Sequence, residues 1–332
     1  MAERLRLMPG AEIPETMLGI GDDAAVIERR EGPPLLFTID SMVEDVHFLP
    51  DIPAEYAGYK ALAINASDIA AMGGRPLAAL VSFVAPRQTD VEWLDAVYDG
   101  FAQAASFLET PLLGGDTAVG PRIVLTVAML GSCPDTAPVL RSGARPGDVV
   151  CVTGRFGGAT GGLRILAMER LIRKPEEDYG HPGLRLLDRH LKPQPRLEAG
   201  RRLAKAGATA MIDVSDGLVA DLGHVCERSG VKMTVEAMSV PIDVDLEAVA
   251  DKVTHNVLET ALTGGEDFEL AVTLPPDAFK KAAAAVKGTG IPLTRIGVVE
   301  DAASREGDDV LVLQDGEPVR FAQPGWIHFE GK

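Results

Sequence analysis

Short apolar segments alternate with longer, alanine-rich segments along the chain, and this pattern predicts alternating strands and helices. Segments such as LLFTI and LAALVSFV have the length and composition of buried strands. The longer segments between them have the composition and length of helices. In its first half the chain therefore predicts strands at residues 35–40, 77–86, 111–117 and 122–132 and helices at residues 51–74 and 89–109.

Residues that typically begin and end helices bound the two helices predicted in the first half. Asp51 is placed to cap the first helix, and Gly73 and Gly74 end it. Thr89 and Glu92 have the spacing of a capping box, in which each side chain bonds the other residue's backbone N–H. We therefore expect Asp51 and Thr89 to be the capping residues.

The second half begins with a linker. Residues 141–148 (RSGARPGD) have linker composition, and we place a domain boundary just before them. The segment 173–195 is polar and contains prolines, and no element is predicted there. Elsewhere the pattern predicts strands at 149–154, 208–215, 231–237 and 268–274, helices at 157–171, 195–207, 216–230 and 276–288, and two final strands. Because many connections are short, the expected fold is α+β, with two domains and mixed sheets.

Composition supports two domains and limits the cellular location. At 332 residues the chain is long for one hydrophobic core, so we divide it into residues 1–137 and 138–332. No apolar run is long enough to span a bilayer, and the N-terminal segment lacks the apolar core of a secretory signal. Cys133, Cys151 and Cys226 are scattered, which indicates buried thiols in a reducing compartment. We expect a cytoplasmic protein with no membrane partner.

The acidic residues are numerous, and several of them follow apolar segments directly. The formal net charge of −17 argues against a nucleic-acid partner, because phosphate binding requires clustered cations. Asp68 lies inside an alanine-rich helix, on one face with Asn65, and a charge in so apolar a helix needs a partner. The other aspartates at the ends of predicted elements are Asp22, Asp23, Asp40, Asp116, Asp213 and Asp216.

Each of these aspartates alone is explained by a turn or a helix cap, and Asp216 is well placed as a cap. If they converge, two carboxylates about 4 Å apart repel by about 4 kcal/mol at an effective dielectric constant near 20. Few basic residues lie near these motifs, so bound cations would have to keep the cluster ionised. Oxygen ligands without nearby cysteine or histidine pairs favour Mg²⁺ or Ca²⁺.

A magnesium cluster in a cytosolic enzyme indicates phosphate chemistry. The chain has no GxxxxGK[ST] loop. The nearest segment, residues 153–163 (TGRFGGATGGL), is explained at least as well by close packing of a helix on a strand. The sequence therefore predicts a nucleotide-binding enzyme without a P-loop.

Seven blocks, in order, resemble the thiamine-monophosphate kinase family of the aminoimidazole-ribonucleotide-synthetase-like superfamily. They extend from Gly19 over nearly the whole chain: GIGDDAAVI, TIDSMVEDVHF, YKALAINASDIAAMGGRP, LLGGDTAVG, RSGARPGD, IDVSDGLVADLGH and LTGGEDFEL. The resemblance implies that the N-terminal domain binds ATP and Mg²⁺ and forms the homodimer interface through its sheet. The C-terminal domain would complete the active site, which would lie at the subunit interface.

The resemblance also implies an activity and the residues that serve it. ATP would transfer its γ-phosphoryl group directly to thiamine monophosphate, in line and assisted by several Mg²⁺ ions, without a catalytic side chain. The metal ligands would be Asp23, Thr38, Asp40, Asp68, Asp116, Asp213 and Asp216. The ATP-binding residues would be Gly115, Asp116, Arg141 and Ser215, and the substrate-binding residues His47, Glu266 and Trp326.

Two alternative functions remain open. Another ATP-dependent enzyme of the superfamily would share much of this pattern, although the sequence lacks the reactive early cysteine of selenophosphate synthetases. A non-catalytic magnesium- or nucleotide-binding module would bind ATP without consuming it. His47, Glu266 and Trp326 also have plain structural explanations, as a solvated loop residue, a cap at a strand entry and a core side chain.

Overall fold

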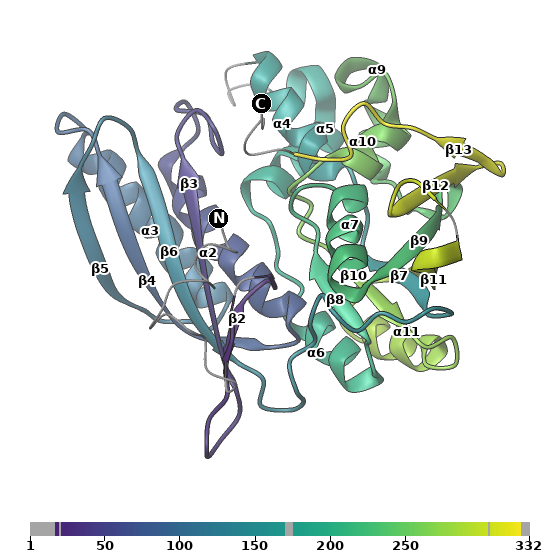
Figure 1. The fold of residues 1–332 in the computed structure, drawn as a ribbon. Coiled ribbons are helices and arrows are strands. Elements are labelled where there is room, and N and C mark those ends of the chain that lie inside the picture. Colours follow the sequence, from purple (N-terminus) through teal and green to yellow (C-terminus); the bar gives the residue numbers. More distant parts are fainter. Residues whose placement is uncertain (1–16, 20, 170–174, 305, 327–332) are drawn as a thin grey trace.

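The computed structural model describes residues 17–19, 21–169, 175–304 and 306–326, which form two lobes, each built on a β-sheet (Figure 1). The sheet of the N-terminal lobe has the strand order β1-β2-β3-β6-β4-β5, and that of the C-terminal lobe has the order β13-β12-β9-β11-β7-β10-β8. Strands β4 and β5 pair in parallel, as do β9 and β12, and the remaining pairs are antiparallel. The predicted α+β class with mixed sheets is confirmed.

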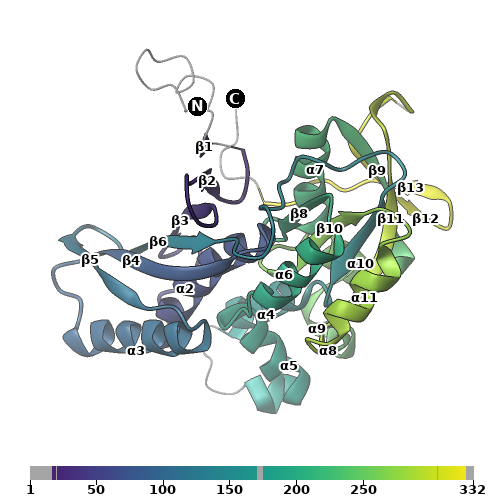
Figure 2. The same ribbon diagram turned by 90° about the horizontal axis from the view of Figure 1, so that it is seen from below.

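The N-terminal lobe is a sheet with helices on one face (Figure 2). Its elements are β1 (Met17–Leu18), β2 (Ala25–Ile27), β3 (Leu35–Val43), α2 (Ala54–Ala71), β4 (Arg75–Ala85), α3 (Val91–Phe107), β5 (Leu112–Val119) and β6 (Val124–Ser132). Helices α2 and α3 pack closely where Gly58 faces Val97 and Gly100 faces Glu55. A Cβ atom at either glycine would lie 2.0 or 1.9 Å from a backbone oxygen of the other helix.

The other face of the N-terminal sheet exposes several large apolar side chains and is not covered by any described element. Phe37, Ile39 and Leu80 are 46%, 61% and 51% exposed. Ile39 and Leu80 both pair with Ala128 of the intervening strand, so they lie on the same face. The alternate residues of the same strands, such as Leu36 and Val81, are buried beneath the helices. An apolar sheet face of this kind marks an interaction surface.

The C-terminal lobe has helices on both faces of its sheet. Along β7, Val150 and Val152 pack in one hydrophobic cluster with residues of α7, whereas Val149 and Cys151 pack in another with residues of α6 and α11. The strands are β7 (Val149–Thr153), β8 (Ala210–Asp213), β9 (Val231–Glu236), β10 (Leu270–Leu274), β11 (Leu293–Asp301), β12 (Val310–Gln314) and β13 (Glu317–Val319). The helices are α4 (Gly158–Glu169), α5 (Pro175–Leu191), α6 (Leu197–Ala206), α7 (Leu218–Ser229), α8 (Val244–Ala248), α9 (Ala250–Val253), α10 (Val257–Thr263) and α11 (Phe279–Lys287), with short 3-10 turns η1 (Ala237–Ser239) and η2 (Ala302–Ser304).

The predicted helix caps in the first half were wrong. Helix α2 begins after Pro53, two residues beyond Asp51. Helix α3 begins after Asp90, which makes no side-chain capping bond. With Asp90 at the cap, the third helical position falls on Trp93, so Thr89 and Glu92 are out of register for a capping box.

The second half differs from expectation at two places. The segment 173–195 contains helix α5, although Pro182 lies inside it. Burial of Leu186, Leu187 and Leu191 outweighs the cost of a proline in a helix, because most helical stability comes from tertiary packing. Three strands, β11, β12 and β13, end the chain where two were expected.

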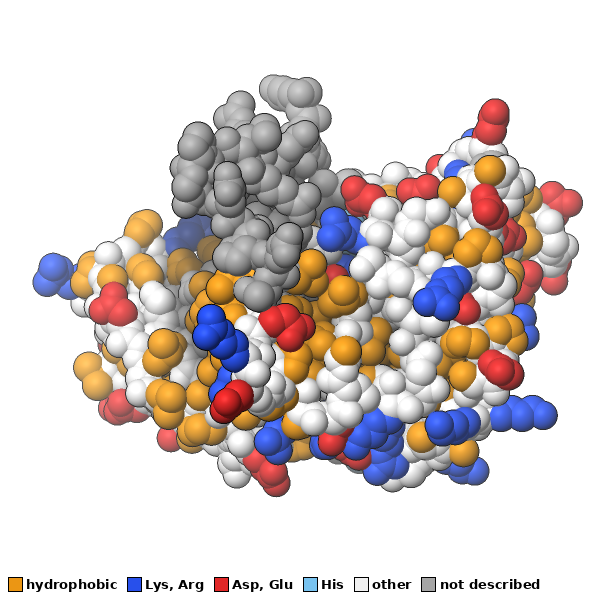
Figure 3. All heavy atoms as spheres, turned by 60° about the horizontal axis from the view of Figure 1, so that its bottom comes forward, with side chains coloured by type: hydrophobic (Ala, Val, Ile, Leu, Met, Phe, Trp, Pro, Cys, Tyr) orange, Lys and Arg blue, Asp and Glu red, His pale blue; other side chains and the backbone are white. Residues whose placement is uncertain are grey.

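Both charged and hydrophobic side chains lie on the surface, and the cysteines are free thiols. On the face shown in Figure 3, Lys and Arg side chains are interspersed with Asp and Glu, and hydrophobic side chains gather over the N-terminal lobe and its junction with the C-terminal lobe. Cys133, Cys151 and Cys226 are all buried and form no disulfide, as expected. None of the described helices is both long enough and apolar enough to cross a membrane.

Candidate active site

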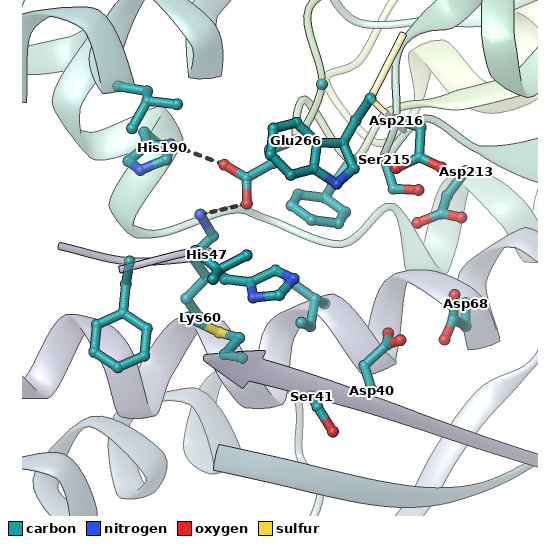
Figure 4. Close-up of a pocket in the computed structure, with 18 of the residues that line it drawn as sticks. Asp40, Ser41, His47, Lys60, Asp68, His190, Asp213, Ser215, Asp216 and Glu266 are labelled. Atoms are coloured by element: carbon teal, nitrogen blue, oxygen red, sulfur yellow. Dashed lines mark ion pairs between the residues drawn. The ribbon is translucent and has the colours of Figure 1, made fainter. Parts of the chain in front are cut away.

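A cavity of about 450 Å³ lies between the two lobes. It is bounded by β3 and the loop that follows, by α2, and by the loops that precede α7 and β10, and Figure 4 shows part of its lining. Most of the residues predicted for the site line this cavity. They are Asp23, Thr38, Asp40, His47, Asp68, Arg141, Asp213, Ser215, Asp216, Glu266 and Trp326.

Three aspartates converge at one end of the cavity, and we call them the acidic cluster: Asp23 and Asp213, which are buried, and Asp68, which is half-buried. One carboxylate oxygen from each lies within 4.8 Å of the others. Asp213 ends β8, Asp68 projects from α2, and Asp23 follows a turn in which Gly21 has a φ of +121°, a conformation that favours glycine. Both lobes therefore contribute to the cluster.

Hydroxyl groups support two of these carboxylates. The Thr38 hydroxyl on β3 donates a hydrogen bond to Asp68, and the Ser67 hydroxyl donates to Asp213 at 2.6 Å. Burial raises the pKa of all three aspartates, that of Asp213 to about 7, and the charge of Asp40 further raises the pKa of Asp68. Oδ2 of Asp23 is buried and has no hydrogen-bond partner within the described part of the chain. The cluster therefore combines an excess of negative charge with an unpartnered carboxylate oxygen, as a cation site requires.

Arg141, at the start of the linker, is the basic residue that reaches the acidic cluster. Its Nε and Nη2 atoms donate to Oδ1 of Asp23 at 3.1 and 2.6 Å. Oδ1 of Asp22 accepts the backbone N–H of Arg141 at 3.0 Å, and burial raises the pKa of Asp22 to about 6. The sequence suggested few cations near the acids, and the structure brings this one from 118 residues along the chain.

Asn65 and Asp221 fix the backbone around the cluster. Asn65 accepts the N–H of Asp40 at 3.2 Å and so ties β3 to α2. Oδ2 of Asp221 accepts the N–H groups of Ser215, Asp216 and Gly217 at 3.0, 3.1 and 3.1 Å. The alternative explanation of Asp216 as a helix cap is wrong, because Gly217 occupies the cap position and Asp221 binds the loop. The Asp216 carboxylate therefore remains in the cavity lining (Figure 4).

Three ionisable side chains meet at the other end of the cavity (Figure 4). Nζ of Lys60 lies 2.7 Å from Oε1 of Glu266, and Nδ1 of His190 lies 3.1 Å from Oε2 of Glu266. Lys60 comes from α2, His190 from α5, and Glu266 from the loop before β10. Sequence reasoning identified Glu266 but missed Lys60 and His190. The available signal was the spacing of Lys60 and Asp68, which lie eight residues apart in the same helix.

His47 and Trp326 complete this part of the lining. Nδ1 of His47 accepts the N–H of Val43 at 3.1 Å, which folds the loop after β3 back on the strand. The backbone N–H of Trp326 donates to the carbonyl oxygen of Asp216 at 2.9 Å. The Trp326 residue is 56% exposed, so it lines the cavity and is not a core side chain.

Gly115 and Asp116 do not line the cavity. They lie on β5, the edge strand of the N-terminal sheet, and β6 and β4 separate this strand from β3. Both residues are exposed. Gly115 permits close approach to β4, since a Cβ there would lie 1.7 Å from the carbonyl oxygen of Val81. The structure of one chain therefore does not bring these two residues together with the acidic cluster.

The glycine-rich segment 153–163 has an internal partner. The N–H groups of Gly157 and Ala159, at the start of α4, donate to the carboxylate of Asp267 at 2.7 and 3.0 Å. Burial raises the pKa of Asp267 to about 7. The backbone donors at this helix start are thus engaged by a side chain, which favours the packing explanation over phosphate binding.

Comparisons with known proteins place these observations in a family. Residues 21–133 match the model of the AIR synthase related protein, N-terminal domain, and residues 145–309 match that of the C-terminal domain. The chain is 38% identical over 312 residues to thiamine-monophosphate kinase of Salmonella typhimurium, covering 94% of this chain and 91% of that protein. It is 36% identical over 317 residues to the Bacillus subtilis enzyme of the same name, covering 94% of each.

A solved structure gives the same result in three dimensions. It is described as AaThiL complexed with AMPPCP and TMP. Its TM-score to this chain is 0.81 at 35% sequence identity, and the match covers 95% of this chain and 93% of that one. The chain therefore matches known proteins in both sequence and fold over nearly its full length.

Proposed function

The chain belongs to the thiamine-monophosphate kinase family of the AIR synthase related proteins, and we propose that it transfers the γ-phosphoryl group of ATP to thiamine monophosphate, giving thiamine diphosphate and ADP. Membership of the family confirms the resemblance described from the sequence. The observation that carries the proposal is the single cavity in which the acidic cluster faces Glu266, His47 and Trp326. The AaThiL structure, which is described with AMPPCP and TMP bound, supports it. Because ATP is an intracellular substrate, the activity also implies a cytoplasmic location.

The acidic cluster fits Mg²⁺ as the cofactor. It offers hard oxygen ligands, a free buried oxygen on Asp23 and raised carboxyl pKa values that a bound cation would lower. Asp23, Asp68 and Asp213 would hold the metal with the help of Thr38, Asp40 and Asp216. Bound Mg²⁺ would neutralise the charge of the phosphate oxygens that must approach one another.

The protein's own residues would orient the two substrates. Arg141 and Ser215 lie beside the acidic cluster and are placed to bind ATP, and His47, Glu266 and Trp326 to bind the thiamine part. The acceptor is a phosphate monoester whose second pKa is about 6, so its oxygen is already largely ionised at neutral pH. The reaction therefore needs charge neutralisation and alignment and does not need a strong general base.

Gly115 and Asp116 enter the proposal through a homodimer. The exposed apolar face of the N-terminal sheet supports dimerisation through that lobe, with residues 1–137 as the dimerising and nucleotide-binding domain. Residues 138–332 would form the domain that completes the site. Since Gly115 and Asp116 lie on the edge strand outside their own cavity, they would bind ATP and Mg²⁺ in the partner's active site.

Mass spectrometry of the products tests the activity. The purified protein is mixed with ATP, Mg²⁺ and thiamine monophosphate, and we expect stoichiometric ADP and thiamine diphosphate. Binding of ATP without its consumption would support a non-catalytic module instead. Consumption only with another acceptor would indicate a different activity of the superfamily, which the curated relatives do not favour.

A further inference from the structure

Glu266 is held from behind by two buried side chains. Lys60 contacts one carboxylate oxygen at 2.7 Å and His190 contacts the other at 3.1 Å. The side chains of Lys60 and His190 are each 3% exposed, whereas that of Glu266 is 27% exposed and lines the cavity. Lys60 and His190 also border the cavity. Because Glu266 exposes far more of its side chain there, a ligand in the cavity meets chiefly the Glu266 carboxylate.

Lys60 needs Glu266 as an ion-pair partner in order to stay charged. A lysine as buried as Lys60 is costly to keep charged without a partner, and Glu266 is its only charged partner among the described residues. Burial alone would raise the pKa of Glu266, but the charge of Lys60 and the contact with His190 hold it well below its usual range. Burial and the charge of Lys60 lower the pKa of His190. Glu266 is therefore ionised at neutral pH, and as an acceptor it faces Nδ1 of His190 at 3.1 Å.

The backbone also restrains Glu266. Its φ is +68°, in the left-handed region that residues other than glycine seldom adopt. Its N–H donates to the carbonyl oxygen of Ser215 at 2.8 Å. Backbone, Lys60 and His190 together fix both the place and the direction of the carboxylate.

Position in the cavity indicates which part of a substrate Glu266 meets. In Figure 4, Glu266, Lys60 and His190 lie at one end and Asp68 and Asp213 at the other. On the proposed function, the phosphate groups lie at the acidic cluster, so the rings of thiamine monophosphate extend toward Glu266. The aminopyrimidine ring carries an amino group that donates hydrogen bonds, and the thiazolium ring is cationic. Both properties suit an ionised carboxylate.

We propose that Lys60 and His190 are positioning residues that hold Glu266 as a fixed hydrogen-bond acceptor for the aminopyrimidine end of the substrate. They determine which phosphate ester is accepted and take no part in phosphoryl transfer. This inference rests on the proposed function and extends it to two residues outside the predicted site.

Steady-state kinetics and binding with two ligands test the inference. The ligands are thiamine monophosphate and its thiazole phosphate fragment, which lacks the aminopyrimidine. For Lys60→Met we expect the KM for thiamine monophosphate to rise about 10- to 100-fold, the range for a charge-assisted hydrogen bond, with kcat within about threefold of wild type. Affinity for the fragment and the KM for ATP should be unchanged.

Matched variants separate positioning from general damage. Lys60→Arg and His190→Asn, which keep a donor toward Glu266, should recover part of the affinity that Lys60→Met and His190→Leu lose. If Lys60→Met unfolds the protein, the double variant Lys60→Met/Glu266→Gln removes both buried charges. It should fold and show the same KM as Glu266→Gln alone, because Lys60 acts through Glu266.

Two results would overturn the inference. One is an equal loss of affinity for the thiazole phosphate fragment, which would place the effect of Lys60 on the phosphate. The other is additivity of the Lys60 and Glu266 effects on KM, which would show independent action. Failure of the proposed function is a separate result, because the wild-type protein would then make no thiamine diphosphate.

Discussion

Arg141 donates from both Nε and Nη2 to one oxygen of Asp23 and leaves the other oxygen, Oδ2, without a hydrogen bond from any described residue. The guanidinium thus supplies part of the positive charge that the acidic cluster needs. A cation bound at Asp23 would compete with Arg141 for this carboxylate. We therefore expect Arg141 to turn toward the phosphates of ATP when the cation binds.

Asp68→Asn should abolish activity and leave the fold intact. Asp68 lies among Asp23, Asp213 and Asp40, and its loss removes a proposed metal ligand. We expect activity to fall at least about 100-fold, since even outer partners of metal ligands cost 10- to 100-fold. In EDTA the variant should melt a few degrees above wild type, because it removes a carboxyl group whose ionisation is opposed by burial and by the neighbouring aspartates.

Differential scanning calorimetry with and without Mg²⁺ makes this measurement, and the exposed Asp99→Asn on α3 is the matched control. Near-normal turnover by a folded Asp68→Asn protein would contradict the assignment.

Stability of the metal-free protein should fall as pH rises from about 4 to about 7. The pKa of Asp213 is raised to about 7 and that of Asp22 to about 6, whereas both are 3.8 in the unfolded chain. In this window the folded state binds more protons than the unfolded state, so deprotonation of Asp22 up to about pH 6 and of Asp213 up to about pH 7 favours unfolding. Thermal melts in EDTA at pH 5 and pH 8 measure the decrease.

Saturating Mg²⁺ should remove most of this decrease, because the metal binds the ionised carboxylates. Asp213→Asn should flatten the profile in EDTA. If Asp213→Asn and wild type show the same dependence of stability on pH in EDTA, Asp213 does not titrate in this range.

Trp326→Ala should weaken thiamine monophosphate binding far more than ATP binding. The Trp326 side chain is exposed at the cavity and offers a ring face to the cationic thiazolium. Such contacts contribute roughly 0.5–2 kcal/mol, so the KM for thiamine monophosphate should rise roughly 2- to 30-fold. Trp326→Phe should keep much of the affinity, and an unchanged KM in Trp326→Ala would indicate a structural tryptophan.

The phosphoryl group should pass directly from ATP to the acceptor. The cavity aspartates are assigned to the metal, and burial raises the pKa of the Cys133 and Cys151 thiols to about 12. No cysteine lines the cavity formed by the described residues. A direct in-line transfer inverts the configuration at phosphorus.

ATP made chiral at the γ-phosphorus measures the outcome. Retention of configuration, or exchange between ADP and ATP without thiamine monophosphate, would show a covalent intermediate.

Mixed dimers should recover activity from two inactive variants. Asp68 serves its own chain's cavity, whereas Asp116 lies on the edge strand and would serve the partner's. Refolding Asp68→Asn and Asp116→Asn together should restore about a quarter of the wild-type sites, because half the dimers are mixed and each holds one intact site. No recovery in a mixture that sedimentation shows to be dimeric would place Asp116 in its own chain's site.

Local sequence patterns predict those parts of the fold that depend on local composition. Helix α2 was predicted from its alanine-rich sequence, and Asp68 was noticed because it is a charged residue in that apolar segment. Helix α5 was missed because its sequence is polar and contains Pro182. It forms because Leu186 and Leu187 are buried against other elements, and that information is not local.

In the site, too, local sequence predicts some residues, whereas others depend on tertiary packing. The acids after strands were recognisable, since each follows an apolar segment. Lys60 was not, because a lysine in a helix usually faces solvent, and only the approach of the C-terminal lobe buries it against Glu266. Asp116 shares the local pattern of the other aspartates, yet the strand order places it outside the cavity of its own chain.

Helix α2 carries side chains for both ends of the cavity, Lys60 at one and Asp68 at the other. Eight residues separate them, which corresponds to about 12 Å at 1.5 Å per residue. A helix is stiff along its axis, so the distance between Lys60 and Asp68 is fixed. An acceptor substrate must be long enough to span it. A shorter phosphate ester could reach the acidic cluster and would still fall short of Glu266. Inserting a single residue between Lys60 and Asp68 would turn one of them off the shared face by about 100°. The rise per residue of helix α2 therefore sets the length of the substrate that the cavity accepts.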